Sequence, residues 1–178
     1  MSIEEIKTIY ADPPWQADEN RTKSDSWIDM KNKYSMMTTE EIKKLRIEYP
    51  IAEEAHIYMW VTSNWLQDGL DVMKEWGFKY ITNIVWYKTS GMGIGNYFRN
   101  FHEICLFGRK KVIKLDRSKV IKSVLEAPRR GHSVKPVEMY DLIEARSPGP
   151  YLELFARHPT PRPNWSYWGN ESEVLDTP

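Results

Sequence analysis

The sequence predicts an α/β fold with an open, mostly parallel sheet and helices on both faces. Short runs of β-branched and aromatic residues alternate with segments in which apolar residues recur at helical spacing. The runs at residues 55–61 and 151–156 are almost continuously apolar, which is typical of strands buried on both faces. A chain of 178 residues fits one such domain, so we expect a single domain over residues 1–178.

The first strand is expected over residues 5–11. Proline has no amide hydrogen to donate to a ladder, so Pro13 and Pro14 end this strand just after Asp12. The polar residues 16–33 show no periodicity and are expected to form a long loop. Such loops in compact domains are usually either functional or disordered.

The other elements follow from equally local signals. Thr38 and Glu41 form a capping-box pattern, which predicts that a helix begins there. Residues 88–100 contain three glycines and are expected to form a mobile loop. The remaining expected elements, in chain order, are a strand over 55–61, a helix over 64–76 that Gly77 stops, strands over 80–87 and 103–107, β character around Val112 and over 120–125, a helix over 136–145 with Pro136 at its first position, and a strand over 151–156.

The expected sheet also predicts where a ligand would bind. Open parallel sheets bind their ligands at the carboxyl ends of the strands. In this chain that rule points to four positions that close or follow expected strands: Asp12, Val61, Tyr87 and Arg157. We therefore expect the functional site around these residues.

The composition predicts a cytoplasmic protein that does not enter the membrane. No apolar run approaches the roughly 20 residues that a membrane helix needs, and the first residues lack the apolar stretch of a secretory signal. Cys105 is the one cysteine in the sequence, which excludes a disulfide framework and a cysteine metal cluster. The four histidines show no ligand spacing, so we expect no metal site.

Basic residues concentrate between positions 109 and 135, although the whole chain carries 25 basic and 25 acidic residues. This segment, the basic stripe, holds ten Lys and Arg residues against two acids, a local charge of +8. Such a stripe suggests a surface that meets a polyanion, with Lys110, Lys111 and Lys114 as candidate substrate-binding residues. Charge alone leaves an alternative open: a solvated strand pair, with substrate meeting the loops at 16–33 and 88–100 instead.

The tetrapeptide Asp12-Pro13-Pro14-Trp15 is the sharpest chemical signal in the chain. The exocyclic amine of adenine is a poor nucleophile, because its lone pair is shared with the ring. The Asp12 carboxylate and the Pro13 carbonyl can each accept one N–H and free that lone pair, while the two prolines keep both acceptors rigid. Trp15 offers a flat face to a flipped-out base. The alternative is a strand-ending turn whose tryptophan packs on the surface.

Other segments add to this tetrapeptide in a recognisable order. They are residues 34–38 followed by EEIKKL, then 59–61, 84–89, 103–106, 132–136, 153–157, and 163–165 with Gly169 and Asn170. With these segments the chain resembles the MT-A type family of N6-adenine methyltransferases. That family includes the catalytic subunit of the eukaryotic mRNA adenosine methyltransferase and bacterial and phage DNA relatives. The resemblance covers about residues 6–171.

The resemblance implies a Rossmann-like class I methyltransferase fold, with the permuted motif order of the β class and S-adenosylmethionine as cofactor. It implies that Lys135 pairs with the carboxylate of the cofactor, and the helix start expected just after Lys135 independently favours an anion. It also implies cofactor contacts from Asp12 and, at the ribose hydroxyls, from Arg157, Asn170 and Glu171.

Two positions depart from the family pattern, and three have plainer explanations. Ala156 stands where relatives often carry glycine, which narrows the space for the cofactor. Glu171 stands where some relatives carry glutamine, and a carboxylate can still accept two hydroxyl protons. Tyr34 matches an aromatic residue beside the base pocket, but it could equally pack onto a helix start. Taken alone, Lys135 could face solvent at a helix entry, and Arg157 could form a surface ion pair.

The sequence therefore predicts an enzyme that methylates the 6-amino group of adenine in DNA. RNA is the main alternative substrate, and the extra regions that eukaryotic RNA enzymes carry are not found in these 178 residues. A catalytically silent, nucleic-acid-binding partner of the same fold is a second alternative, although Lys135 and Asn170 are retained beside the tetrapeptide. Methylation of a protein amide or a small molecule is a third. The sequence leaves a homodimer open.

Overall fold

A computed structural model describes residues 4–16, 36–91, 93, 95, 97–115, 118–131, 134–157 and 161–169. These residues form a sheet with the strand order β5-β3-β4-β2-β1-β6-β7. The strands are β1 Ile6–Ala11, β2 Ile51–Val61, β3 Lys79–Lys88, β4 His102–Arg109, β5 Val124–Ala127, β6 Tyr151–Leu154 and β7 Trp165–Trp168. Only β4 runs antiparallel to its neighbours, while the other four pairings are parallel. The expected open, mostly parallel sheet is confirmed.

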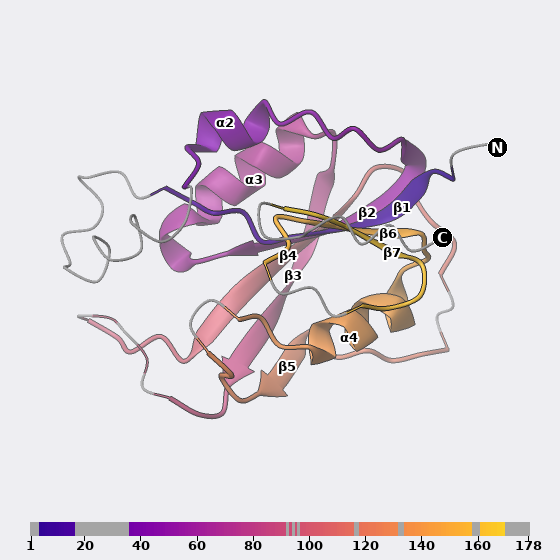
Figure 1. The fold of residues 1–178 in the computed structure, drawn as a ribbon. Coiled ribbons are helices and arrows are strands. Elements are labelled where there is room, and N and C mark those ends of the chain that lie inside the picture. Colours follow the sequence, from indigo (N-terminus) through magenta and orange to yellow (C-terminus); the bar gives the residue numbers. More distant parts are fainter. Residues whose placement is uncertain are drawn as a thin grey trace.

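Helices cover both faces of this sheet, as expected (Figure 1). The helical segments are α2 Thr39–Lys43, the short 3-10 helix η1 Ser63–Trp65, α3 Leu66–Glu75 and α4 Glu138–Arg146. Alternate residues of β2 point to opposite faces, because side chains alternate along a strand. Ile57 and Met59 join the core on the α2 and α3 side, whereas Tyr58 and Trp60 join the core on the α4 side. This double burial explains the continuous apolar run in the sequence.

The capping box expected at the start of α2 is confirmed. The Thr38 side chain accepts a hydrogen bond from the Glu41 amide at 3.2 Å, and the Thr38 amide donates one to the Glu41 carboxylate at 2.7 Å.

Several other element boundaries differ from the expected ones. The helix expected over 64–76 begins as a 3-10 turn. Pro136 lies two residues before α4, and Val112 lies outside every strand of the described residues. The loop expected over 16–33 falls, apart from Gln16, outside the described residues.

The strand ends show where the site is positioned. Ala11 pairs with Met59 of β2 and with Leu154 of β6, so β1, β2 and β6 finish at the same end of the sheet. We call this the carboxyl end of the sheet. The reversed strand β4 begins there, and β3 also ends there, because Tyr87 pairs with His102. The four positions to which the sequence pointed therefore lie at one end of the sheet.

In the described part of the chain, no helix has the length and apolar character needed to cross a membrane.

Candidate active site

Asp12 is the first residue after β1 and is held by backbone hydrogen bonds. Its amide donates to the carbonyl of Leu154 in β6 at 3.4 Å. In the turn that follows, the Trp15 amide donates to the Pro13 carbonyl at 2.9 Å, and the Met37 amide donates to the Pro14 carbonyl at 2.9 Å. The double proline is therefore clamped between the end of β1 and the residue that precedes the cap of α2. A carbonyl has two lone pairs, so the Pro13 oxygen can accept one further hydrogen bond.

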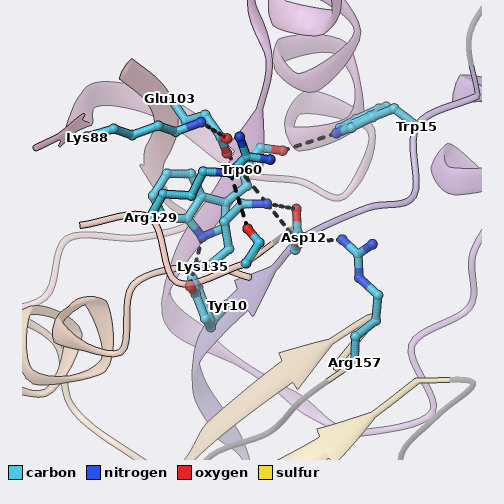
Figure 2. A network of polar contacts seen from close by, with 10 residues as sticks. Tyr10, Asp12, Trp15, Trp60, Lys88, Glu103, Arg129, Lys135 and Arg157 are labelled. Carbon is cyan, nitrogen blue, oxygen red and sulfur yellow. Dashed lines mark hydrogen bonds and ion pairs between the residues drawn. The ribbon is translucent and has the colours of Figure 1, made fainter. Parts of the chain in front are cut away.

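Trp15 packs into the core rather than onto the surface. Its side chain is only 7% exposed, and its indole N–H donates to the carbonyl of Trp60 at 3.1 Å. This burial excludes the alternative in which the tryptophan of the turn merely covers the surface. It fixes the turn against β2, as Figure 2 shows. Stacking of a base on Trp15 stays a prediction.

Lys135 approaches Asp12 from the segment that leads into α4 (Figure 2). Its ammonium donates to both carboxylate oxygens of Asp12, at 2.8 Å each, and lies 3.6 Å from the Glu103 carboxylate. The same ammonium lies 5.5 Å from the ring centroid of Trp60. Burial lowers the pKa of Lys135, but Asp12 and Glu103 outweigh it and hold that pKa above its usual value.

Arg157 approaches Asp12 from the other side, just past β6. Its guanidinium donates to one Asp12 oxygen at 2.7 Å. The chain turns sharply before it, because Phe155 adopts a φ of 63°, in the left-handed region. Ala156 is 1% exposed, and its backbone lies close to Gly169. A Cβ added to Gly169 would lie only 2.7 Å from the backbone nitrogen of Ala156. The alanine that departs from the family pattern is thus packed against a glycine.

Together these contacts form a chain of alternating charges. Lys88 pairs with Glu103 at 2.6 Å, Glu103 faces Lys135, and Lys135 and Arg157 converge on Asp12. Among these five residues, three cations face two anions, and Figure 2 shows the further cation Arg129 in the same network. An ionised carboxylate offers about four lone-pair sites, and the hydrogen bonds from Lys135 and Arg157 use three of them. Asp12 can therefore accept one more donor.

Sequence reasoning did not single out Glu103 or Glu153 as site residues. Glu153 lies in β6, is 9% exposed and accepts from the Tyr140 hydroxyl at 2.6 Å. Burial raises the pKa of Glu153 to about 7, helped by the charge of Asp12 and opposed by the Tyr140 hydrogen bond. Both acids interrupt apolar strands near the carboxyl end of the sheet, and that interruption is the signal that could have revealed them.

Three residues predicted for the site lie outside the described residues: Tyr34, Asn170 and Glu171. Their roles stay predictions. Gly169, which directly precedes Asn170, lies against the residue next to Arg157. Among the described residues, no group of three metal-ligating side chains could hold a metal ion.

The fold divides the basic stripe between the two ends of the sheet. The Lys110 amide donates to the carbonyl of Ala55, five residues before Trp60 along β2, which places Lys110 about 17 Å from the level of Asp12. The Lys110 ammonium lies 5.3 Å from the Phe78 ring centroid, and Lys111 pairs with Glu53. Lys114 follows as an exposed residue.

The later residues of the stripe lie at the other end. Arg129 and Arg130 follow β5, whose last residue Ala127 pairs with Lys88, so both arginines lie near the carboxyl end of the sheet. In the described residues the basic stripe therefore does not form one continuous surface, because β5 carries the chain from one end of the sheet to the other. The assignment of Lys110 and Lys111 to substrate binding stays a prediction, but the structure does not bring them to Asp12.

The arrangement of a rigid Asp-Pro-Pro-Trp turn at the carboxyl end of the sheet can be compared with known proteins. The MT-A70 family model matches residues 6–171. The chain belongs to the MT-A70 family. The resemblance noted in the sequence is thereby confirmed.

Three relatives show the range of this family. The chain is 31% identical over 176 residues to the N(6)-adenosine-methyltransferase MT-A70-like protein of Drosophila melanogaster, covering 94% of this chain and 27% of the relative. It is 29% identical over 175 residues to the human N(6)-adenosine-methyltransferase catalytic subunit METTL3, covering 94% and 28%. It is 30% identical over 182 residues to the Type II methyltransferase M.MunI of a Mycoplasma species, covering 93% and 77%.

The chain thus spans roughly a quarter of the length of the METTL3-type relatives and about three quarters of M.MunI. Across all of these matches, however, almost the whole chain is aligned. The family domain is therefore what this chain shares with them.

Proposed function

We propose that this MT-A70 protein transfers a methyl group from S-adenosylmethionine to the 6-amino group of adenine in DNA. The observation that carries the proposal is the position of the Asp12-Pro13-Pro14-Trp15 turn at the carboxyl end of the sheet, with Asp12 facing two converging cations. Ligands of open α/β sheets bind at this end.

The two acceptors of the turn suit an amine that must give up its conjugation. Asp12 has one lone-pair site left by Lys135 and Arg157, and the Pro13 carbonyl has one left by the Trp15 amide. One N–H of the adenine amine on each acceptor would localise the nitrogen lone pair for attack. Because the turn is already fixed by backbone hydrogen bonds, little reorganisation is needed in the transition state.

The residues present fit the cofactor. S-adenosylmethionine would supply an electrophilic methyl group and carries its own carboxylate, ammonium and ribose hydroxyls. Lys135 and Arg157 place two cations beside Asp12, in a network with an excess positive charge. Lys135 would bind the carboxylate, and Arg157 with Asn170 and Glu171 the ribose, which leaves the open lone-pair site of Asp12 to the adenine amine. Members of the MT-A70 family use this cofactor.

DNA is the proposed substrate because of the match with M.MunI. The chain is 30% identical to this Type II methyltransferase over 182 residues, which cover 93% of the chain. The sequence also resembles the bacterial and phage DNA relatives of the family. RNA is the second candidate, because the N(6)-adenosine-methyltransferases match over the same residues.

Incubation with labelled S-adenosylmethionine and either duplex DNA or RNA tests the proposal. Mass spectrometry of the digested nucleosides should find N6-methyldeoxyadenosine from the DNA reaction. An Asp12→Ala protein purified in parallel controls for a contaminating methyltransferase. If only the RNA is labelled, RNA replaces DNA as the substrate. If neither nucleic acid is labelled, the chain is better explained as a catalytically silent partner.

A further inference from the structure

The segment between β3 and β4 exposes an unusual group of aromatic side chains. Tyr97 is 97% exposed, Phe98 is 84% exposed and Phe101 is 40% exposed. Tyr87, near the end of β3, is 47% exposed. Among the described residues only one other large aromatic, Tyr80, is exposed to this extent, and it lies near the opposite end of the sheet. The exposed rings are therefore concentrated at the carboxyl end.

The base of this segment is held at the carboxyl end of the sheet by the ends of the neighbouring strands. The Lys88 amide donates to the Phe101 carbonyl at 2.8 Å, which closes the base of the segment. The Arg129 amide donates to the Ser90 hydroxyl at 3.1 Å, and this ties the segment to the chain that leaves β5. β3 ends and β4 begins at the carboxyl end of the sheet, where β1 ends just before Asp12.

The electrostatics of the same region favour an anionic ligand. Residues 88–102 and 127–135 contain five Lys and Arg residues and no Asp or Glu. Three of these cations pair with acids outside the two ranges: Lys88 with Glu103, Lys135 with Asp12 and Arg130 with Glu138. Arg99 stands exposed between Phe98 and Phe101. Aromatic rings interleaved with cations are what proteins use to bind unpaired nucleic acid, because every base has a flat face and every nucleotide a phosphate.

We propose that residues 97–101 form a stacking platform for unpaired bases that flank the target adenine. The proposal rests on the proposed function and extends it to the way in which the strand is held. Tyr97 and Phe98 stack on bases, and Arg99 contacts the phosphates between them. A base that is taken out of a duplex leaves its neighbours without a stacking partner. The aromatic rings of the platform give those neighbouring bases a new one.

A second copy of this chain is a weaker candidate for the occupant of this surface. A two-fold contact would place the same patch of each copy against the other. Because residues 97–101 contain Arg99 and no acid, the two copies would bring like charges together, which opposes association. A polyanion meets no such repulsion.

Fluorescence anisotropy with a mixed-sequence, adenine-containing single-stranded DNA oligonucleotide tests the platform. Tyr97→Ala with Phe98→Ala should weaken binding by at least about 10-fold, since each base–ring stack is worth roughly 5- to 150-fold in affinity. Tyr97→Trp with Phe98→Trp should retain the wild-type affinity. Val120→Ala is the matched control, because Val120 is 93% exposed and its neighbour Lys119 lies beside the C-terminal end of α4.

The outcomes of this experiment distinguish a base-stacking platform from an interface between two copies of the chain. Unchanged affinity in the double-alanine variant, or failure of the tryptophan variant to restore binding, overturns the platform. If the double-alanine variant instead converts a dimer into a monomer in analytical ultracentrifugation, the rings are an interface between copies. The methyl-transfer assay on the wild type separates the two proposals. If the wild type is active and the ring variants bind DNA normally, only the platform is overturned. If the wild type is inactive on both DNA and RNA, the proposed function is overturned.

Discussion

Lys135 donates to both carboxylate oxygens of Asp12 at 2.8 Å, although 123 positions separate the two residues in the sequence. With side chains 16% and 18% exposed, they form a largely buried ion pair. Removal of one partner from such a pair leaves an uncompensated charge in a poorly solvated place. The pair therefore serves two ends: it holds the acceptor of the turn in place, and it keeps a cation ready for an anionic group.

Asp12→Ala should abolish methyl transfer while the protein keeps its fold. Loss of one preorganised acceptor costs about 2.7–4 kcal/mol in comparable sites, which corresponds to a kcat lower by roughly 100- to 1000-fold. Single-turnover assays measure the effect, and circular dichroism checks the fold. Glu75→Ala, an exposed acid at the end of α3, is the control. Activity above about a tenth of wild type would remove Asp12 from the reaction.

Lys135→Met should weaken binding of S-adenosylmethionine. A charge-assisted hydrogen bond of this kind contributes roughly 1.5–3 kcal/mol, so we expect a dissociation constant about 10- to 150-fold higher. Asn170→Ala should act in the same direction. Isothermal calorimetry measures both, with the exposed Lys122→Met as control. If Lys135→Met and Asn170→Ala bind the cofactor as the wild type does, neither residue belongs to the cofactor site.

Glu153→Gln should stabilise the protein at neutral and basic pH. Burial raises the pKa of Glu153 from 4.5 to about 7, so the folded protein holds a proton that the unfolded chain releases between these values. The stability that this proton supports is fully present below pH 4.5 and is lost as the pH rises through 7. The difference in unfolding free energy between the Glu153→Gln variant and the wild type should therefore grow by up to about 3 kcal/mol between pH 4.5 and pH 8.

Urea denaturation of both proteins across that pH range measures the difference. Tyr140→Phe provides a second variant, because the Tyr140 hydrogen bond lowers the pKa of Glu153. Without that hydrogen bond, the pKa of Glu153 should rise further and the decline in stability should extend to higher pH. If the difference in unfolding free energy between Glu153→Gln and the wild type stays constant with pH, Glu153 is not protonated in the folded protein near neutral pH.

Local signals explain what the sequence could predict. The end of β1 at Asp12 and the capping box of α2 depend on neighbouring residues only, so proline chemistry and a four-residue pattern were enough. β7 was not expected, because its four residues lie in a proline-rich tail and become a strand only by pairing with β6. The Glu153–Tyr140 contact likewise depends on how α4 packs on the sheet.

The basic stripe shows a different limit. Net charge along a segment does not reveal which end of a sheet each residue reaches, and here Lys110 and Arg129 lie at opposite ends. Only the pairing of β5 with β3 separates them. This division is a consequence of topology, and it changes which cations can lie beside a substrate bound at Asp12.

Salt titrations of nucleic-acid binding should distinguish the two ends of the sheet. Neutralisation of Arg99, Arg129 and Arg130 to Gln should flatten the dependence of log affinity on log salt, by about 0.9 for each phosphate of duplex DNA that the variant no longer neutralises. Neutralisation of Lys110, Lys111 and Lys114 should leave that slope near wild type, because Lys110 lies over Phe78 and Lys111 pairs with Glu53, about 17 Å along the sheet from Asp12.

Cofactor affinity serves as the control for the Lys110, Lys111 and Lys114 variant, because none of the three belongs to the network around Asp12 in Figure 2. Both variants also remove three positive charges, so any change in non-specific attraction caused by net charge alone is matched between them. A flattened slope in the Lys110, Lys111 and Lys114 variant, with an unchanged slope in the arginine variant, would place the nucleic acid at the far end of the sheet. In that case the phosphates would track the amino-terminal half of β2, and the carboxyl end would receive the target base alone.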